Sequence, residues 1–169
     1  TCLVGSEMCI RDSAATVTEV LGFMGKEAEY RGIDVTVEID ELPPLETNRG
    51  RLQQILLNLV NNAFAAVDDG GRIVISAWKS ANETVTVEVE DNGCGMDEHE
   101  LRRIFEPFYT TKGSRGGTGL GLSLTYSLAR ELGGSIDVES TPKVGTHFRV
   151  TLPLSVPNTK GSSDEGTSG

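Results

Sequence analysis

A carboxylate and two closely spaced glycines form the first candidate binding site in the sequence. Asp91 ends a regular alternating segment, and Gly93 and Gly95 follow it within residues 91–96. A carboxylate at a strand end can accept a hydrogen bond from a ligand, and glycines let a flat ligand approach the backbone closely. Asp-Asn-Gly is also a common turn sequence, so this segment alone is compatible with either a turn or a ligand floor.

A second candidate lies on a predicted helix over residues 49–67. Gln54, Asn58 and Asn62 follow one another at intervals of four residues, so their amides stack along one edge of the helix. They border an apolar stripe, and half-buried amides need polar partners. Oxygen ligands that face a cavity suit Mg²⁺, which takes further ligands from water and phosphate. The alternative is that the asparagines are ordinary surface residues.

A glycine-rich segment, residues 113–122, opens directly into a predicted helix over residues 120–132. Free backbone N–H groups at the start of a helix, together with the helix dipole, form a site for phosphate. The glycines are not followed by Lys-Ser/Thr and no strand directly precedes them, so the segment is neither a Walker nor a dinucleotide-binding pattern. Lys112 and Arg115 place two cations beside the expected phosphates, with ordinary solvated loop charges as the alternative.

The remaining sequence predicts the elements that hold these groups. Apolar residues recur at helical spacing over 14–31 and alternate with polar residues over 33–40. A short helix is predicted after the Asp91 turn, at 96–105. Three long helices and about five strands, mostly in hairpins, predict an α/β two-layer sandwich with a mixed, largely antiparallel sheet. The other predicted strands are 72–79, 84–90, 135–139 and 146–152.

Composition limits the class of protein. The 169 residues carry a formal net charge of −10, which argues against binding to nucleic acid or to an anionic membrane. No segment approaches the roughly 18 consecutive apolar residues of a transmembrane helix. The three cysteines have neither disulfide nor zinc spacing, so we expect a cytoplasmic location. We expect residues 1–12 to be a non-native or linker remnant, 13–154 to form the domain, and 155–169 to be a disordered tail.

Five segments of the sequence carry a resemblance to a known family. The segments are Asn58-Leu59-Val60-Asn61-Asn62-Ala63, Asp91-Asn92-Gly93-Cys94-Gly95, Ile104-Phe105-Glu106-Pro107-Phe108, Gly117-Thr118-Gly119-Leu120-Gly121-Leu122 and Gly145-Thr146. In this order they resemble the successive boxes of the histidine-kinase catalytic, ATP-binding domain. The wider superfamily includes gyrase, the ninety-kilodalton heat-shock chaperones, mismatch-repair ATPases and anti-sigma kinases. The resemblance covers about residues 14–153 and implies the Bergerat-type ATP-binding fold.

The resemblance implies an adenine site around Asp91. This carboxylate would accept a hydrogen bond from the adenine amino group. Gly93 and Gly95 would let the ring approach the backbone, with Met96 next to it. Thr146 would support the adenine through water.

The resemblance also implies a metal and phosphate site. Asn62, assisted by Asn58, would ligate Mg²⁺, and Lys112 or Arg115 would stabilise charge on the transferring phosphoryl group. The glycines of the phosphate loop would cradle the triphosphate, and two phenylalanines would anchor a mobile lid over it. The further cofactor-binding positions implied are Ala65, Phe105, Phe108, Gly117, Thr118, Gly119, Leu120, Gly121 and Leu122.

One position separates kinases from ATPases in this superfamily. Relatives that hydrolyse ATP carry a carboxylate where Asn58 stands, so the resemblance favours phosphoryl transfer to a histidine. Many sensor kinases carry a basic residue where Ala65 stands, and its absence is similar to the nitrogen-regulation class. His99 is expected to be a surface residue and His147 a structural one, so neither is the phosphoacceptor.

The resemblance therefore implies an incomplete histidine kinase. The phosphoaccepting helical hairpin would lie upstream or on another chain, and a response-regulator receiver domain would be the second partner. The chain could belong to the cytoplasmic part of a membrane-anchored sensor. The alternatives are an anti-sigma-type serine kinase or switch, and a gyrase- or chaperone-like ATPase.

Overall fold

A five-stranded sheet forms one layer of the protein. The computed structural model describes residues 8–10, 13–111 and 117–155. The sheet has the order β2-β4-β5-β7-β6, with β2 parallel to β4 and all other neighbours antiparallel. This confirms the predicted mixed, largely antiparallel sheet. The strands are β2 (Asp34–Ile39), β4 (Arg72–Ser80), β5 (Thr84–Asp91), β6 (Ser135–Thr141) and β7 (Gly145–Pro153).

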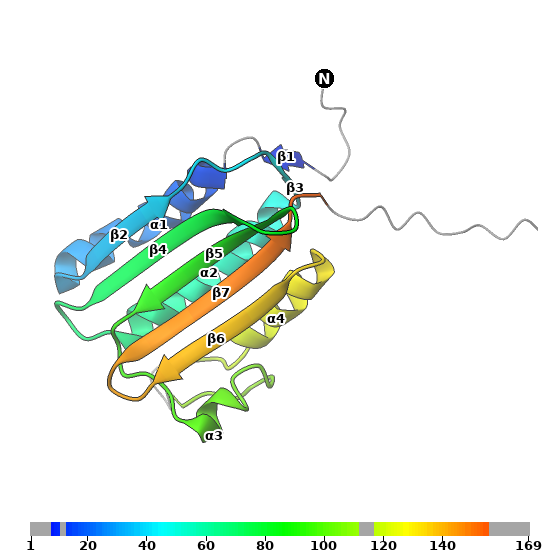
Figure 1. Ribbon diagram of the computed structural model, residues 1–169. Helices are drawn as coiled ribbons and strands as arrows, with labels where there is room; N and C mark the ends of the chain where they lie inside the picture. The colour runs from blue at the N-terminus through cyan, green and yellow to red at the C-terminus, as the bar shows by residue number, and fades with distance from the viewer. Residues whose placement is uncertain (1–7, 11–12, 112–116, 156–169) are drawn as a thin grey trace, which may run out of the picture.

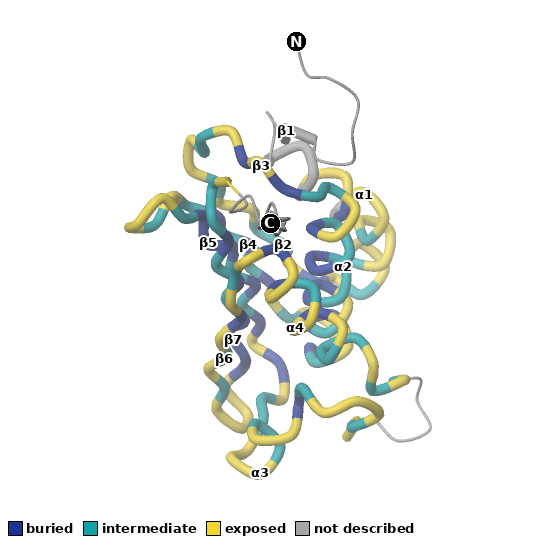
Figure 2. Tube along the Cα trace, turned by 90° about the vertical axis from the view of Figure 1, so that its right-hand side faces the viewer, coloured by how far each residue is buried: buried dark blue, intermediate teal, exposed yellow. Residues whose placement is uncertain are grey.

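Three long helices form the second layer and cover one face of the sheet (Figure 1). Buried residues of both layers face each other (Figure 2), and Ile55 and Leu59 are fully buried between the layers. This arrangement confirms the predicted two-layer sandwich. No described helix is both long and apolar enough to cross a membrane. The helices are α1 (Ser13–Arg31), α2 (Arg49–Ala66) and α4 (Gly121–Glu131).

Two elements, a short helix and an edge strand, differ from the prediction. The helix predicted at 96–105 is limited to α3 (Glu98–Leu101), because Asp97 caps its start and the chain then continues in turns. Val37 belongs to the apolar set of the predicted alternation over 33–40, but it is 42% exposed because β2 is an edge strand with a neighbour on one side only.

A small second sheet was not predicted. β1 (Met8–Ile10) pairs antiparallel with β3 (Leu45–Thr47), so part of the segment that we expected to lie outside the fold contacts it. Strand pairing uses backbone groups, so it needs no apolar period in either segment, and the sequence pattern gave no sign of it. Most of the predicted tail, residues 156–169, lies outside the described residues.

Candidate functional site

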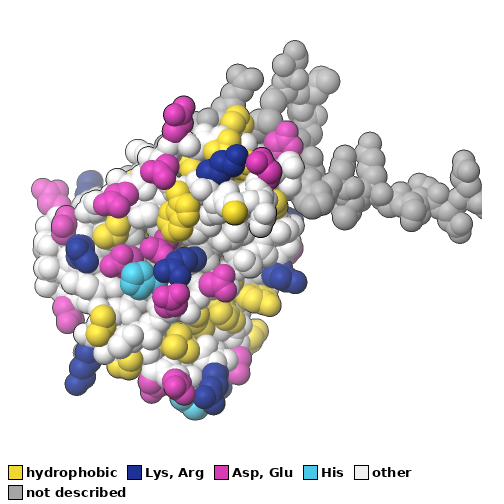
Figure 3. Space-filling model, in the orientation of Figure 1, with side chains coloured by type: hydrophobic (Ala, Val, Ile, Leu, Met, Phe, Trp, Pro, Cys, Tyr) yellow, Lys and Arg dark blue, Asp and Glu magenta, His cyan; other side chains and the backbone are white. Residues whose placement is uncertain are grey.

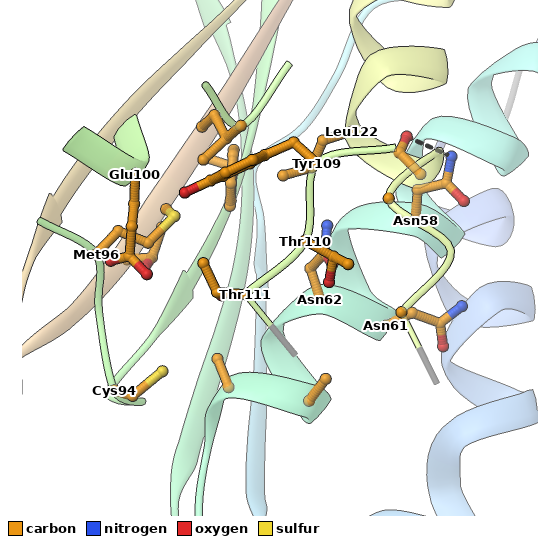
Figure 4. A pocket seen from close by; sticks show the side chains of 18 of the residues that line it. Asn58, Asn61, Asn62, Cys94, Met96, Glu100, Tyr109, Thr110, Thr111 and Leu122 are labelled. Atoms are coloured by element: carbon orange, nitrogen blue, oxygen red, sulfur yellow. Dashed lines mark hydrogen bonds between the residues drawn. The ribbon is translucent and has the colours of Figure 1, made fainter. Parts of the chain in front are cut away.

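A cavity of about 450 Å³ lies between one end of the sheet and helices α2 and α4. Asn58, Asn61 and Asn62 lie on its α2 side, and Met96 and Glu100 lie on the opposite side (Figure 4). Most of the residues that the sequence singled out line this one space. They are Asn58, Asn62, Ala65, Asp91, Gly95, Met96, Gly117, Thr118, Gly119, Gly121, Leu122 and Thr146.

The floor of the cavity is built on Asp91, which is only 5% exposed. Its Oδ1 accepts a hydrogen bond from the backbone N–H of Gly93 at 2.8 Å. Gly93 itself does not line the cavity. It lies against Ala66 at the end of α2, where a Cβ would collide with the Ala66 carbonyl group. Gly93 therefore supports Asp91 by permitting a close approach of two backbones.

The segment after Asp91 is held from both sides. The N–H of Cys94 donates to Ala66 O at 3.0 Å, and its carbonyl accepts from the N–H of Lys143 at 2.7 Å. Gly95 has a φ of 64° and presses against Thr141 in the β6–β7 turn, where a Cβ would collide with the Thr141 carbonyl group. The segment is thus a turn, and this turn forms one side of the cavity.

The asparagine edge connects α2 to the start of α4. Gln54 Nε2 donates to Asn58 Oδ1 at 3.0 Å, and Asn58 Nδ2 donates to Gly121 O at 3.1 Å and to Thr125 Oγ1 at 3.2 Å. An amide oxygen has two acceptor positions, so Asn58 Oδ1 keeps one for another donor or a cation. Asn62 lies one turn further along α2 and also lines the cavity. Two neutral amide oxygens beside an open cavity fit a hard cation such as Mg²⁺.

The loop before α4 is closed at its base by Phe108 and Gly119. The N–H of Phe108 donates to Gly119 O at 2.8 Å. Both residues have positive φ, 65° and 68°, and a Cβ on Gly119 would collide with the backbone of Phe108. Glycine at 119 thus permits this contact, whereas Phe108 holds a strained conformation for a side-chain-bearing residue.

The two phenylalanines, Phe105 and Phe108, lie outside the lining of the cavity. Phe108 is 75% exposed, so its backbone rather than its ring fixes the loop. The Phe105 ring lies 5.4 Å from that of Tyr126 on α4 and packs against the core. Neither residue lines the cavity, and nor does Leu120, which is 42% exposed. In the sequence, these two phenylalanines indicated apolar contacts, but not whether their rings would face the cavity, the core or solvent. Lys112 and Arg115 lie outside the described residues.

Several lining residues were not predicted. Tyr109 lines the cavity, and the guanidinium of Arg103 lies 4.4 Å from the centre of its ring. Tyr109 directly follows Phe108 and lies between residues 91–96 and the glycine-rich segment 113–122. This position in the sequence was the available sign that it lines the cavity. Glu100 also lines the cavity, and its carboxylate accepts the N–H of Asp97 as part of the α3 cap. The unpredicted lining residues are Asn61, Ala66, Cys94, Glu100, Ile104, Tyr109, Thr110, Thr111 and Phe148.

The opposite face of the sheet carries mixed charges (Figure 3). There Arg149 donates to Glu88 and, at 2.7 Å, to Glu139. The hydrogen bond with Glu88, followed by that with Glu139, raises the pKa of Arg149. His147 Nδ1 lies 3.8 Å from a Glu88 oxygen and 3.9 Å from a Glu90 oxygen. This placement agrees with a structural rather than a phosphoaccepting His147, since it projects away from the cavity.

Comparison with known proteins places the chain in a family. Residues 47–156 match the family described as histidine kinase-, DNA gyrase B- and HSP90-like ATPase. The histidine-protein kinase AtoS of Escherichia coli (strain K12) is 38% identical over 141 residues, or 83% of this chain and 23% of that protein. Sensor protein TorS of the same strain is 43% identical over 138 residues, or 80% of this chain and 15% of that protein. The chain therefore spans less than a quarter of the length of these relatives.

Solved structures share the fold. The catalytic domain of histidine kinase ThkA matches with a TM-score of 0.79 at 29% identity, covering 89% of this chain and 97% of that one. Full-length ShkA in complex with AMPPNP matches with a TM-score of 0.81 at 28% identity, covering 93% of this chain and 33% of that one. The matched region contains every residue that lines the cavity. The chain therefore belongs to the histidine kinase-, DNA gyrase B- and HSP90-like ATPase family, as an ATP-binding domain of the histidine-kinase type.

Proposed function

We propose that the chain is the catalytic domain of a sensor histidine kinase. It binds Mg-ATP in the cavity and transfers the γ-phosphoryl group to a histidine on a phosphoacceptor hairpin. The observation that carries this proposal is the placement of buried Asp91 at one end of the cavity and of Asn58, Asn62 and Gly121 at the other. One end thus suits a base with an amino group, and the other suits a metal-bound triphosphate.

Different residues of the cavity bind the adenine, the metal ion and the phosphates. Asp91 accepts from the adenine amino group, and Gly95 lets the ring lie against the backbone. At the other end, Asn62 and Asn58 hold Mg²⁺, which when bound neutralises phosphate charge. The backbone N–H groups at the start of α4 receive phosphate oxygens, because they have no partners within the helix and lie at its positive end. Lys112 and Arg115 supply further positive charge.

The kinase reaction is favoured over hydrolysis because no described residue of the cavity is placed to act as a base toward water. An amide such as Asn58 does not take up a proton at neutral pH, and its hydrogen bonds direct it toward α4. Among the described residues that line the cavity, the carboxylates are Asp91 and Glu100. Asp91 lies at the floor, and Glu100 is engaged in the α3 cap. Neither position suits the activation of water at the γ-phosphate.

The proposed partners follow from the relatives. ThkA, at 29% identity and a TM-score of 0.72, has been solved in complex with the response regulator protein TrrA. We assign a partner of the same class to this chain, which acts in the cytoplasm and receives its phosphoacceptor histidine either from its own upstream segment or from another chain.

Nucleotide binding tests the first half of the proposal. Asp91→Asn should lower ATP affinity by at least tenfold, because an amide cannot offer two acceptor oxygens to the amino group and to Gly93. Asp137→Asn, an exposed residue on β6, is the matched control. Titration calorimetry measures both. Unchanged ATP affinity in Asp91→Asn would refute the assignment of the adenine site.

Phosphoryl transfer tests the second half. The chain is mixed with radiolabelled ATP, Mg²⁺ and a phosphoacceptor hairpin from a histidine-kinase relative. We expect an acid-labile, alkali-stable label on the hairpin and little free phosphate. Steady release of phosphate by the chain alone would favour the ATPase alternative, and label on a serine would favour the anti-sigma type.

A further inference from the structure

Three side chains form a row across the sheet behind the cavity. In the strand register, Asp91 of β5 lies opposite Thr146 of β7, and Thr146 lies opposite Ser140 of β6. Directly opposed residues of neighbouring strands project to the same face of a sheet. Asp91 and Thr146 both line the cavity, so Ser140 points toward the same side, one strand further from Asp91.

The Ser140 hydroxyl has a full set of partners. Its Oγ accepts the N–H of Met96 at 2.8 Å and donates to Gly145 O at 3.0 Å. It also lies 2.9 Å from Thr146 Oγ1. A hydroxyl group has one proton and two acceptor positions. Since the proton goes to Gly145 and one acceptor position is taken by Met96, the remaining acceptor position receives the proton of Thr146.

The direction of this last hydrogen bond determines what Thr146 presents to a ligand. Thr146 is 3% exposed. With Met96 and Gly145 already bonded to Ser140, we assign Thr146 as the donor in its 2.9 Å contact with Ser140, so its hydroxyl proton is not available to a ligand. What remains on the cavity side are acceptor positions, next to the carboxylate of Asp91. Asp91 and Thr146 therefore both present acceptors to the base, and acceptors attract an amino group and repel a carbonyl oxygen.

We propose that Ser140 is a specificity-determining residue for the purine base. By holding the Thr146 proton, it keeps this wall of the cavity selective for adenine over bases that carry an oxygen at C6. Ser140 does not touch the nucleotide and acts through Thr146. The inference rests on the proposed binding of adenine at Asp91 and adds a second group, the Thr146 hydroxyl held by Ser140, that disfavours guanine.

Substitution of Ser140 separates this role from simple packing. In Ser140→Ala, the Thr146 hydroxyl is free to rotate and donate to a C6 oxygen. We expect ATP to bind about threefold to tenfold more weakly and GTP to bind no more weakly, the range expected for one neutral hydrogen bond. The ratio of the two dissociation constants therefore falls. Ser140→Thr restores the hydroxyl and the ratio, and Ser135→Ala, an exposed serine at the start of the same strand, leaves it unchanged.

The measurement is titration calorimetry of the 169-residue chain with non-hydrolysable ATP and GTP analogues, with the melting temperature of each variant recorded. An unchanged ratio in folded Ser140→Ala would overturn the inference. So would an equal loss of affinity for both nucleotides, because that is the result expected of packing alone.

A second comparison needs no substitution and covers the case in which Ser140→Ala does not fold. Purine riboside triphosphate lacks any group at C6, whereas inosine triphosphate carries an oxygen there. The unsubstituted chain should bind the inosine nucleotide more weakly, and equal binding would overturn the inference. If the unsubstituted chain binds ATP at Asp91 but fails this comparison, the proposed function stands and the role of Ser140 falls. If it does not bind ATP at all, the proposed function falls first.

Discussion

Asn58 Nδ2 lies 3.1 Å from the carbonyl oxygen of Gly121, the first residue of α4. One amide on α2 thereby fixes the position of the helix whose N-terminus faces the cavity. The same Nδ2 also lies 3.2 Å from Thr125 Oγ1, a side chain that is completely buried. The proposed metal site and the proposed phosphate site are thus parts of one hydrogen-bonded unit.

This connection predicts energetic coupling between Asn58 and Thr125. Asn58→Ala and Thr125→Val should each destabilise the fold, and the double variant should lose less than the sum, by about 0.5–1.5 kcal/mol. Urea unfolding of the four proteins measures the coupling. Ser127→Ala is the control, because Ser127 bonds within α4, and it should be additive with Asn58→Ala to about 0.5 kcal/mol. Full additivity of Asn58 and Thr125 would contradict the proposed unit.

Gly95→Ala should be destabilising because two penalties coincide. The φ of 64° disfavours any side chain, and the added Cβ would collide with the Thr141 carbonyl group. We expect a loss of about 2–4 kcal/mol in the free energy of unfolding. Gly25→Ala is the matched control: it lies in α1 with nothing near its Cβ position, and should stabilise the fold by about 0.5–1 kcal/mol. Equal midpoints of urea unfolding for the two variants would contradict this reading of the adenine segment.

The local pattern predicted the residues that lie on regular elements. The alternation that ends at Asp91 predicts β5, and the spacing of Asn58 and Asn62 predicts one edge of α2, so the local pattern is enough to propose both sites. Ser140 was missed because its role depends on the register between β6 and β7, which no local pattern encodes. The exposure of Phe108 was also unpredictable, since it follows from a positive φ in an irregular turn.

Arg31 should stabilise the fold by capping the C-terminal end of α2. Its guanidinium donates to Phe64 O and Val67 O, each at 2.7 Å, and to Asp69 at 2.8 Å. Arg31→Met should lower the free energy of unfolding by about 2 kcal/mol, because the last carbonyl groups of α2 lose a charged donor. Arg31→Lys should recover only part of this, since an ammonium group cannot form the same fork.

The control for Arg31 is an arginine in an exposed ion pair. Arg102 is 76% exposed in its pair with Glu98. Arg102→Met should change stability by no more than about 0.5 kcal/mol in the same urea experiment. If Arg31→Met costs no more than Arg102→Met, then Arg31 is an ordinary surface residue and not a cap.

We expect the contribution of Arg149 to the free energy of unfolding to stay constant with pH in the neutral and mildly alkaline range. Its pKa is raised by the hydrogen bond with Glu88 first, and then by that with Glu139. A raised pKa means that the protonated form stabilises the fold at every pH below the unfolded-state value. This contribution is lost only as the pH rises through the folded-state value, in strongly alkaline solution. Because the Arg149 side chain is 36% exposed, solvent screening limits the cost of Arg149→Met to about 1 kcal/mol.

Unfolding of Arg149→Met in urea at pH 8 and at pH 10 tests the sign of this linkage, with Lys79→Met as the matched control. Lys79 pairs with Glu83 at 3.2 Å in an exposed position, so its removal should cost little at either pH. The difference in unfolding free energy between the unsubstituted chain and Arg149→Met should be the same at both values. A cost that disappears by pH 10 would show that Arg149 loses its proton far earlier than its carboxylate partners allow, and would contradict the ion-paired arrangement on the outer face of the sheet.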